Sequence, residues 1–243
     1  MGITNWFIGC SGFHYDEWKT IFYPEKLPKS KWFEFYCEHF NTLELNVTFY
    51  RFPTVETLRI WYDNSPKSFR FSLKAPMLIT HFKKFTDSTR LLSDFYNALE
   101  KGLKDKLGCV LFQLPKQIVR SDEKLEQIIK CIKPGFDNVI EFRDASWWHQ
   151  KVYDKLKTKS ITFCGISHPP LPDEVIKKSS VIYYRFHGRP SLYKTRYKIS
   201  ELSEFKNSIT KFKGNQKAFI YFNNTAEGAA VLNAKELKEL SDK

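Results

Sequence analysis

The chain has 243 residues, a formal net charge of +12 and many aromatic residues, namely 22 Phe, 12 Tyr and 6 Trp. This length suffices for one large domain, and an α/β barrel typically needs about 250 residues. We see no signal peptide and no run of about 18 apolar residues, so we expect no membrane partner. The five cysteines are widely scattered, which argues against a zinc or redox motif. We therefore expect a cytoplasmic protein with reduced thiols.

Short apolar runs with strand character alternate along the whole chain with segments that carry helical signals. The predicted strands are residues 6–10, 42–47, 69–74, 109–114, 139–143, 161–166, 181–187 and 218–223. The predicted helices are residues 30–40, 54–62, 88–102, 121–132, 147–156, 200–212 and 226–240. Only the segment after the sixth strand, residues 173–178, is short.

The strict alternation of strands and helices predicts a parallel sheet with helices outside it. Eight such units at a spacing of roughly 30 residues favour a closed (β/α)8 TIM barrel over an open doubly wound sheet. No G-x-G-x-x-G motif follows the first strand, which further disfavours a dinucleotide-binding fold. We predict one α/β domain of this type over residues 1–243.

The fifth predicted strand carries two charges in an apolar run. Because side chains alternate between the faces of a strand, Glu141 and Arg143 share one face, while Ile140 and Phe142 share the other. Buried charges are costly unless they are paired or used. This face is therefore predicted to serve the function.

The same alternation places polar side chains at the carboxyl ends of other strands, where TIM barrels carry their active sites. The residues predicted to gather at this end are Ser11, Glu44, Asn46, Lys74, Gln113, Glu141, Arg143, Arg185, His187 and Asn223, with His81 in a loop at the same end. The strand residues at the other alternate positions are apolar, as expected for a face that helices cover. The alternative is a satisfied polar network that only fixes the register of the strands.

The predicted site holds two carboxylates against three strong cations, which favours a small anionic or phosphate-bearing ligand. Lys74, Arg143 and Arg185 would hold the anion. Glu141 or Glu44 would act as general base or acid with help from His187, while Asn46, Gln113 and Asn223 would orient the substrate. The reaction would be acid–base chemistry of the hydrolase, lyase or isomerase kind. Too few histidines and carboxylates converge to predict a metal, and we predict no cofactor.

Two other functions remain open at this stage. The net charge and the segment 188–198, in which cations alternate with aromatic residues, fit a non-catalytic nucleic-acid-binding protein. A high lysine content spread along the whole chain, as on a solvated surface, is the explanation of the charge that we favour. A metabolite-binding scaffold without catalysis is a further alternative. The sequence does not indicate an oligomeric state.

Several motifs in chain order resemble the domain of unknown function 72, or YecE-like, family. They are Ile8-Gly9-Cys10-Ser11-Gly12, His39-Phe40-Asn41-Thr42-Leu43-Glu44-Leu45-Asn46, Thr48-Phe49-Tyr50, Phe69-Arg70-Phe71-Ser72-Leu73-Lys74-Ala75-Pro76, Leu111-Phe112-Gln113-Leu114-Pro115, Glu141-Phe142-Arg143, Ser146-Trp147-Trp148, Arg185-Phe186-His187-Gly188 and Tyr221-Phe222-Asn223-Asn224. The resemblance implies a TIM barrel without a settled activity and a likeness to phosphate-handling barrels. We also count Tyr50 and Trp147, which stand in these motifs, among the substrate-binding residues.

The chain departs from the pattern of this family at two positions. The family commonly has an acidic residue at the end of the sixth strand, where this chain reads Gly165-Ile166-Ser167-His168. It more often has Asp at the position of Thr225. The loss of both carboxylates disfavours a metal-dependent hydrolase.

Overall fold

The computed structural model describes residues 4–176, 179–211 and 216–242. The chain forms two compact units. Unit 1 comprises Met1–Glu44 and Gly165–Lys243, and unit 2 comprises Leu45–Cys164. Among the described residues, no helix is long and apolar enough to cross a membrane.

The strands belong to two sheets, and every predicted strand is present. The first sheet has the order β1-β9-β8-β7 and the second has the order β2-β3-β4-β5-β6. The strands are β1 (Thr4–Cys10), β2 (Thr42–Leu45), β3 (Arg70–Lys74), β4 (Leu107–Gln113), β5 (Asp137–Glu141), β6 (Thr162–Phe163), β7 (Gly165–Ser167), β8 (Val181–Phe186) and β9 (Gln216–Phe222).

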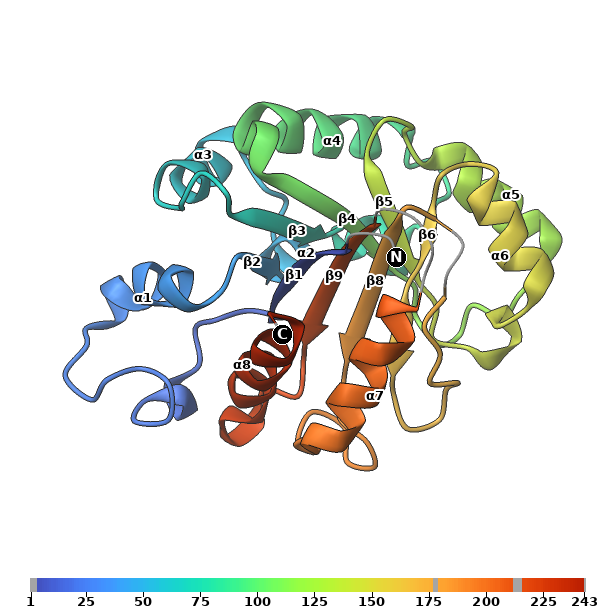
Figure 1. The fold of residues 1–243 in the computed structure, drawn as a ribbon. Helices are drawn as coiled ribbons and strands as arrows, with labels where there is room; N and C mark the ends of the chain where they lie inside the picture. Colours follow the sequence, from blue (N-terminus) through green and yellow to red (C-terminus); the bar gives the residue numbers. More distant parts are fainter. Residues whose placement is uncertain (1–3, 177–178, 212–215, 243) are drawn as a thin grey trace. The chain divides into compact units, whose positions relative to one another are not determined.

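The helices alternate with these strands along the chain (Figure 1). Those of four residues or more, apart from a π-helical turn at Leu78–Phe82, are α1 (Trp32–His39), α2 (Val47–Tyr50), α3 (Val55–Asp63), α4 (Thr89–Leu103), α5 (Asp122–Cys131), α6 (Gln150–Lys157), α7 (Ile199–Thr210) and α8 (Ala229–Ser241). Two predicted helix starts are capped as their sequences suggest. Thr54 Oγ1 accepts a hydrogen bond from Thr57 N, and Ser121 Oγ accepts one from Lys124 N.

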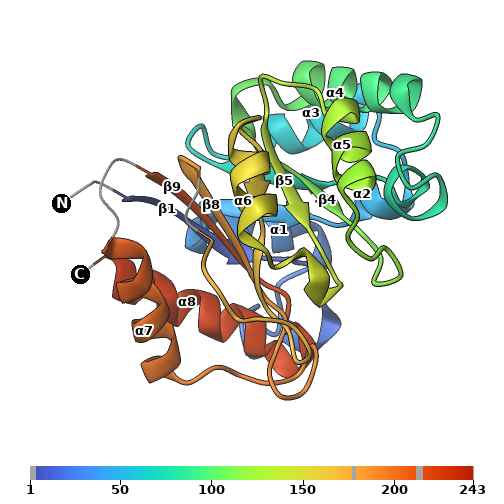
Figure 2. The ribbon, with the colours of Figure 1, turned by 90° about the vertical axis from the view of Figure 1, so that its right-hand side faces the viewer.

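In unit 1 the parallel strands are aligned so that their carboxyl ends lie level. Cys10 pairs with Phe222, which pairs with Phe186, and Phe186 pairs with Ser167. Helix α8 packs against β1 and β9, and α7 packs against α8 (Figures 1 and 2). The helices cover one face of this sheet. The polar side chains that alternate along the strands therefore lie on the opposite face.

In unit 2 the parallel strands β3, β4, β5 and β6 follow one another in chain order. Helices α3 and α4 pack together, and α4 contacts β4. Figure 2 shows α3, α4 and α5 on one side of β4 and β5. The core between them is apolar and aromatic, with Phe112, Phe95 and Leu99 fully buried.

The elements differ from the prediction at three places. The predicted strand 161–166 forms two short strands, because the chain leaves the second sheet after β6 and joins the first sheet as β7. The predicted strand 42–47 ends at Leu45, and Val47 begins the short helix α2. Strand β5 ends at Glu141, so Arg143 lies two residues beyond it.

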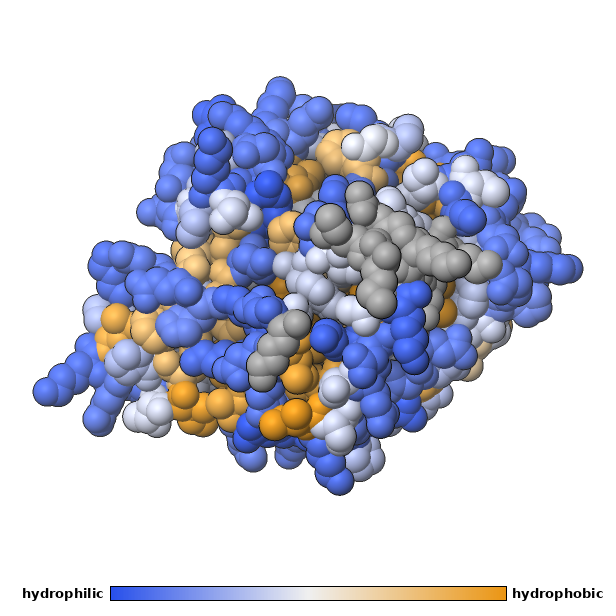
Figure 3. Space-filling model, viewed as in Figure 1, coloured by the Kyte–Doolittle hydropathy of each residue, from blue (hydrophilic) through white to orange (hydrophobic). Residues whose placement is uncertain are grey.

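On the face drawn in Figure 3, hydrophilic residues predominate and hydrophobic residues form smaller areas between them. This distribution fits the predicted solvated surface of a chain with a net charge of +12. A charged surface of one sign bears on solubility and association rather than on the position of a site.

Gly9 in β1 permits a close approach of two backbone segments in unit 1. A Cβ atom at this position would lie 2.2 Å from the carbonyl oxygen of Thr42 and 2.7 Å from Tyr36 Oη. We expect Gly9→Ala to lower the free energy of unfolding by about 1–3 kcal/mol, because a backbone carbonyl cannot move aside cheaply. Urea denaturation would measure the change.

A comparison variant for this prediction is Gly135→Ala, at a position that differs from Gly9 in its open space and in its positive φ. A Cβ atom there meets nothing within 4 Å, although the backbone has a positive φ of 88°. This control isolates the cost of the left-handed conformation, about 1–2 kcal/mol. A Gly9→Ala protein that is as stable as the parent would contradict the close approach.

Candidate functional site

The predicted site residues divide between the two units. Ser11, Glu44, Arg185, His187 and Asn223 belong to unit 1. Asn46, Tyr50, Lys74, His81, Gln113, Glu141, Arg143 and Trp147 belong to unit 2. Most of them lie in or directly after the last residues of parallel strands, whereas Tyr50 lies in α2, His81 in the turn Leu78–Phe82 and Trp147 in the turn Ala145–Trp147.

In unit 1 the centre of the polar group is the fully buried carboxylate of Glu44. It accepts hydrogen bonds from Ser11 Oγ at 2.5 Å and from Tyr183 Oη at 2.6 Å. Arg185 Nη2 donates to the same carboxylate at 2.6 Å, and the arginine side chain is only 2% exposed. This is a buried ion pair whose carboxylate is satisfied by three donors. Such a carboxylate is well suited to holding Arg185 in place.

Tyr15 is hydrogen-bonded to Ser11 of this group. Its hydroxyl donates to the carbonyl oxygen of Ser11 at 2.6 Å. The pKa of Tyr15 is raised to about 12, mainly by burial and further by the nearby Cys10. Tyr15 is therefore a neutral hydrogen-bond donor at physiological pH.

His187 follows β8 and is fully buried. Its Nδ1 lies 2.9 Å from Asn223 Nδ2, and its backbone N–H donates to the carbonyl oxygen of Ser167. Because an amide nitrogen can only donate, Nδ1 accepts and the ring proton sits on Nε2. Asn223, which directly follows β9, therefore fixes the tautomer of His187.

In unit 2 three neighbouring strands end in predicted site residues. Lys74 ends β3, Gln113 ends β4 and Glu141 ends β5. Gln113 pairs with Glu141 in the register, and Lys74 pairs with Leu111. The carboxyl ends of parallel strands lie at the same edge, so these side chains share one end of the sheet.

Glu141 and Arg143 form the ion pair that the strand pattern predicts. Arg143 Nε donates to Glu141 Oε1, and the glutamate is fully buried while the arginine side chain is 12% exposed. Cys164 Sγ lies 4.0 Å from the second carboxylate oxygen. The pair therefore keeps a buried carboxylate next to a partly accessible guanidinium.

Lys74 lies against aromatic residues. Its ammonium group lies 3.8 Å from the centre of the Phe49 ring, which is a cation–π distance. His81 packs its ring edge against the same phenylalanine at 5.0 Å, from the π-helical turn Leu78–Phe82. Phe49 thus links the two predicted residues. The carbonyl oxygen of Lys74 accepts a hydrogen bond from Thr48 Oγ1 at 2.7 Å, which holds α2 next to the end of β3.

The pKa of His81 reflects both its burial and the cations near it. The pKa of His81 is lowered to about 4, first by burial and then by the positive charges of Lys74 and Arg143. Thr80 Oγ1 lies 2.8 Å from its Nδ1. His81 is therefore neutral at physiological pH and able to exchange a proton with a ligand.

The remaining predicted residues of unit 2 have different surroundings. The Asn46 Oδ1 atom is buried and has no hydrogen-bond partner among the described residues, while Gln113 Nε2 donates to the carbonyl oxygen of Leu114. Tyr50 is 74% exposed and its ring contacts Phe49. Trp147 is fully buried, stacks on Phe142 at 4.1 Å and donates to the carbonyl oxygen of Ile118. Its contacts are those of a core residue, and its substrate contact stays a prediction.

The prediction did not include Phe49, Thr80 or Cys164 as members of the site. Phe49 and Thr80 stand next to Tyr50 and His81, but their own residue types gave no signal of a charged partner. Cys164 follows β6, and only the pairing of β6 with β5 brings it near Glu141. Among the described residues, no group of three His, Cys, Asp or Glu side chains could hold a metal ion.

Comparison with known proteins places this chain in a family. Residues 7–243 match the family model described as "Protein of unknown function DUF72". The chain belongs to the DUF72 family. It is 26% identical over its whole length to the UPF0759 protein YunF of Bacillus subtilis, of which it covers 94%. Over 34% of the chain it is 32% identical to the UPF0759 protein YecE of Escherichia coli, of which it covers 30%.

Solved structures agree with the DUF72 assignment. A crystal structure of a DUF72 family protein from Thermotoga maritima is 26% identical and has a TM-score of 0.89, with 98% of this chain and 100% of that chain covered. A D-psicose 3-epimerase from Clostridium cellulolyticum has a TM-score of 0.54 at 11% identity, with 96% of this chain and 97% of that chain covered. These matches confirm the predicted α/β fold of the TIM-barrel class.

Proposed function

We propose that this DUF72 protein is an enzyme that acts on a phosphate-bearing or other anionic substrate. The single observation that carries the proposal is that Lys74 ends β3 and Arg143 lies just after β5, both close enough to His81 to lower its pKa further than burial does. Arg143 forms an ion pair with the buried carboxylate of Glu141. An anion bound by Lys74 and Arg143 would offset the repulsion between their two positive charges.

The chemistry available at this edge is proton transfer next to a bound anion. Lys74 and Arg143 would hold the anion, Arg143 through its planar guanidinium. His81 is neutral at physiological pH and would accept a proton as general base. Glu141 is the second candidate, because it is a buried carboxylate within the same group. Gln113 and Asn46 would orient the substrate, and the unpartnered Asn46 Oδ1 offers an acceptor.

The polar group of unit 1 supports a second part of the proposal. His187 presents its Nε2–H as a donor because Asn223 occupies Nδ1. Glu44 and Arg185 neutralise one another, so we assign them the positioning of Ser11 and Tyr183 ahead of direct acid–base chemistry. The roles of Glu44 as a base and of Arg185 as an anion ligand stay predictions.

The alternative of a non-catalytic nucleic-acid-binding protein has less support in the segment 188–198. Arg189 pairs with Asp173 at 3.3 Å, and Arg196 pairs with Glu236. Tyr197 is only 5% exposed. Two arginines and one aromatic ring that the alternative requires for phosphate and base contacts are thus engaged within the protein. The metabolite-binding scaffold differs from the enzyme only in the absence of turnover.

Titration of His81 with and without a dianion tests the proposed anion site. We expect sulfate, which stays a dianion between pH 4 and 7, to raise the pKa of His81 above its value of about 4. The reason is that the bound charge offsets Lys74 and Arg143. A ligand that raises a pKa binds together with a proton, so sulfate should bind more tightly as the pH falls through the window between the two pKa values. Proton NMR of the imidazole measures this directly.

Two variants show which group titrates and which charges act on it. His81→Gln identifies the resonance and should remove the pH dependence of sulfate binding in this window. Lys74→Met should raise the pKa of His81 without sulfate, because it removes one of the two positive charges. An unchanged titration of His81 in saturating sulfate, or no sulfate binding at all, would refute the anion site.

A further inference from the structure

Two exposed aromatic side chains stand beside the proposed anion site in unit 2. Tyr50 is 74% exposed and Phe82 is 69% exposed, the highest values among the large hydrophobic side chains of the described residues. Tyr50 is the last residue of α2, and Phe82 is the last residue of the π-helical turn that carries His81. Apolar side chains that gather on a protein surface commonly mark the place where a ligand or partner binds.

The ring of Phe49 connects both segments to Lys74. Its centre lies 5.2 Å from the ring centre of Tyr50 and 5.0 Å from that of His81, both in edge-to-face contact. The ammonium group of Lys74 lies 3.8 Å from the same ring centre. Thr48 Oγ1 donates to the carbonyl oxygen of Lys74 at 2.7 Å and so holds α2 at the end of β3. The exposed ring of Tyr50 therefore stands one ring away from a cation of the anion site.

Folding leaves the two exposed rings largely unused. Among the described residues, the Tyr50 hydroxyl makes no hydrogen bond, and its ring contacts only the ring of Phe49, which is 8% exposed. Phe82 contacts no other aromatic ring in the described part of the chain, and it shares the turn with Leu78, which is 41% exposed. A flat ligand that covered these rings would remove apolar surface from water, which is favourable.

A buried acceptor lies on the same side of α2 as Tyr50. Asn46 directly precedes this helix and has helical backbone angles, with φ of −91° and ψ of −15°. Residues four apart in a helical turn share one side of it, which places Asn46 beside Tyr50. The Asn46 Oδ1 atom is buried and has no hydrogen-bond partner among the described residues. Since a buried acceptor without a donor is costly, an N–H or O–H group of a ligand would satisfy it.

We propose that the anion of this site is a small phosphate-bearing compound with a flat aromatic or heteroaromatic group. Lys74 and Arg143 hold the phosphate, and the flat group stacks on Tyr50. The proposal rests on the proposed function and names the substrate class of the same site. The cations decide against an uncharged aromatic ligand, because such a ligand would cover Lys74 without compensating its charge. A phosphate-bearing compound without a ring would leave Tyr50 exposed.

Isothermal titration calorimetry of the full chain with two phosphonates tests the flat group. Phenylphosphonate and methylphosphonate carry the same charge when both are dianions, and neither has an ester bond that the protein could hydrolyse. We expect phenylphosphonate to bind about tenfold more tightly, since the stacking of a flat ring on an aromatic side chain contributes affinity of this order. Inorganic phosphate serves as the reference for the anion site alone.

Three variants assign the difference to one ring. Tyr50→Ala should weaken phenylphosphonate about tenfold and leave methylphosphonate and inorganic phosphate within twofold. Tyr50→Phe keeps the ring and should retain the affinity for phenylphosphonate. The matched control Ile60→Ala removes a side chain that is 62% exposed from α3 in the same unit, and it should change none of the affinities. Because Tyr50 is mostly exposed, circular dichroism should show the same fold for all three proteins.

The outcomes separate this proposal from the proposed function. If inorganic phosphate and methylphosphonate bind but phenylphosphonate binds no more tightly, or if Tyr50→Ala weakens all three equally, the flat group is refuted and the anion site stands. If none of the three binds, both are refuted. Vesicles of phosphatidylcholine and phosphatidylserine that bind the parent but not Tyr50→Ala would overturn the proposal, because the rings would then serve a membrane surface. A single-stranded oligonucleotide that binds through Tyr50 more tightly than phenylphosphonate would overturn the small ligand.

Discussion

Glu44→Ala is expected to lower the free energy of unfolding by about 3–5 kcal/mol. Glu44 is fully buried and is the carboxylate partner of Arg185, which is itself only 2% exposed. Removing the carboxylate leaves a guanidinium in the interior without its counter-charge, and Ser11 and Tyr183 lose their acceptor. Urea denaturation followed by tryptophan fluorescence and by circular dichroism would measure the loss.

A double-mutant cycle separates the buried charge from the simple loss of side-chain volume. Glu44→Ala/Arg185→Met removes both charges, and it should recover about 2 kcal/mol or more relative to Glu44→Ala alone. Glu239→Ala, an exposed carboxylate of α8, should change the stability by less than about 0.5 kcal/mol. Additive effects of Glu44→Ala and Arg185→Met would contradict the ion pair as the source of the loss.

Strand parity predicted the composition of both polar groups. It placed Ser11, Glu44 and Arg185 on one face, and these side chains are joined by hydrogen bonds in unit 1. It also placed Glu141 and Arg143 together, and they form an ion pair. The prediction works because a period of two is enforced by the backbone of a strand, whatever its neighbours are.

Local helices and turns beside the strands were not predictable in the same way. Helix α2 is formed by Val47–Tyr50, a run whose β-branched and aromatic residues favour a strand. It is held by the hydrogen bond from Thr48 to the carbonyl oxygen of Lys74, a contact between residues 26 positions apart. Tertiary contacts of this kind override local propensity, and no pattern within the segment announces them.

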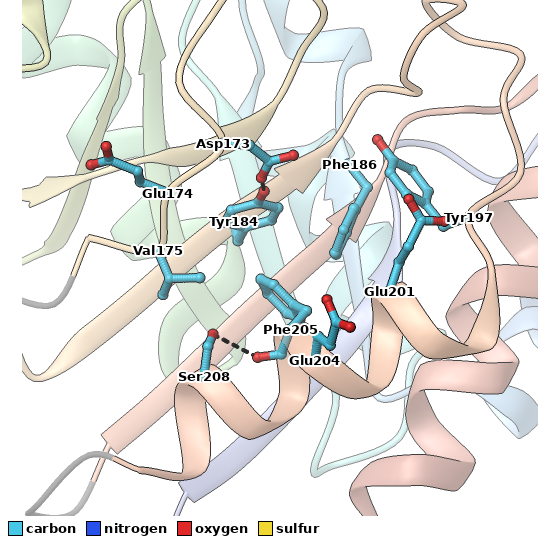
Figure 4. Close-up of a pocket in the computed structure, with 10 residues that line it drawn as sticks. All are labelled: Asp173, Glu174, Val175, Tyr184, Phe186, Tyr197, Glu201, Glu204, Phe205 and Ser208. Carbon is cyan, nitrogen blue, oxygen red and sulfur yellow. Dashed lines mark hydrogen bonds between the residues drawn. The ribbon is translucent and has the colours of Figure 1, made fainter.

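A pocket of about 520 Å³ beside β8 and α7 (Figure 4) could not be foreseen from the sequence, although four acidic residues line it. Asp173 and Glu174 come from a segment after β7, while Glu201 and Glu204 come from α7. Nothing in their spacing shows that both segments flank β8. The relevant signal was the short sixth unit, because a missing helix exposes the strand face that it would cover.

The proposed anion site and the pocket beside β8 have opposite charge. The ends of β3 and β5 carry cations whose effect appears in the lowered pKa of His81. The pocket beside β8 carries carboxylates over an aromatic floor. The net charge of +12 therefore does not describe the local charge of either region, and the anion site has to be tested by variants that change one local charge.

Lys74→Met is expected to weaken the binding of a phosphate-bearing ligand about tenfold to a hundredfold. A hydrogen bond to a charged group contributes about 1.5–3 kcal/mol, and the methionine keeps an apolar side chain over the Phe49 ring. Lys74→Arg, which keeps the charge, should retain most of the affinity. Isothermal titration calorimetry with inorganic phosphate and with a sugar phosphate would measure the three proteins.

The matched control is Lys101→Met, which removes an exposed lysine from α4 in the same unit. It should leave the affinity for phosphate within twofold, because an exposed charge is screened at physiological salt. Equal weakening by Lys74→Met and Lys101→Met would mean that the net charge attracts the anion and that the ends of β3 and β5 are not its site. Once a substrate is found, His81→Gln should still bind it and fail to convert it. A His81→Gln protein with full turnover would instead leave Glu141 as the base, because it is the second proton acceptor of the site and is paired with Arg143.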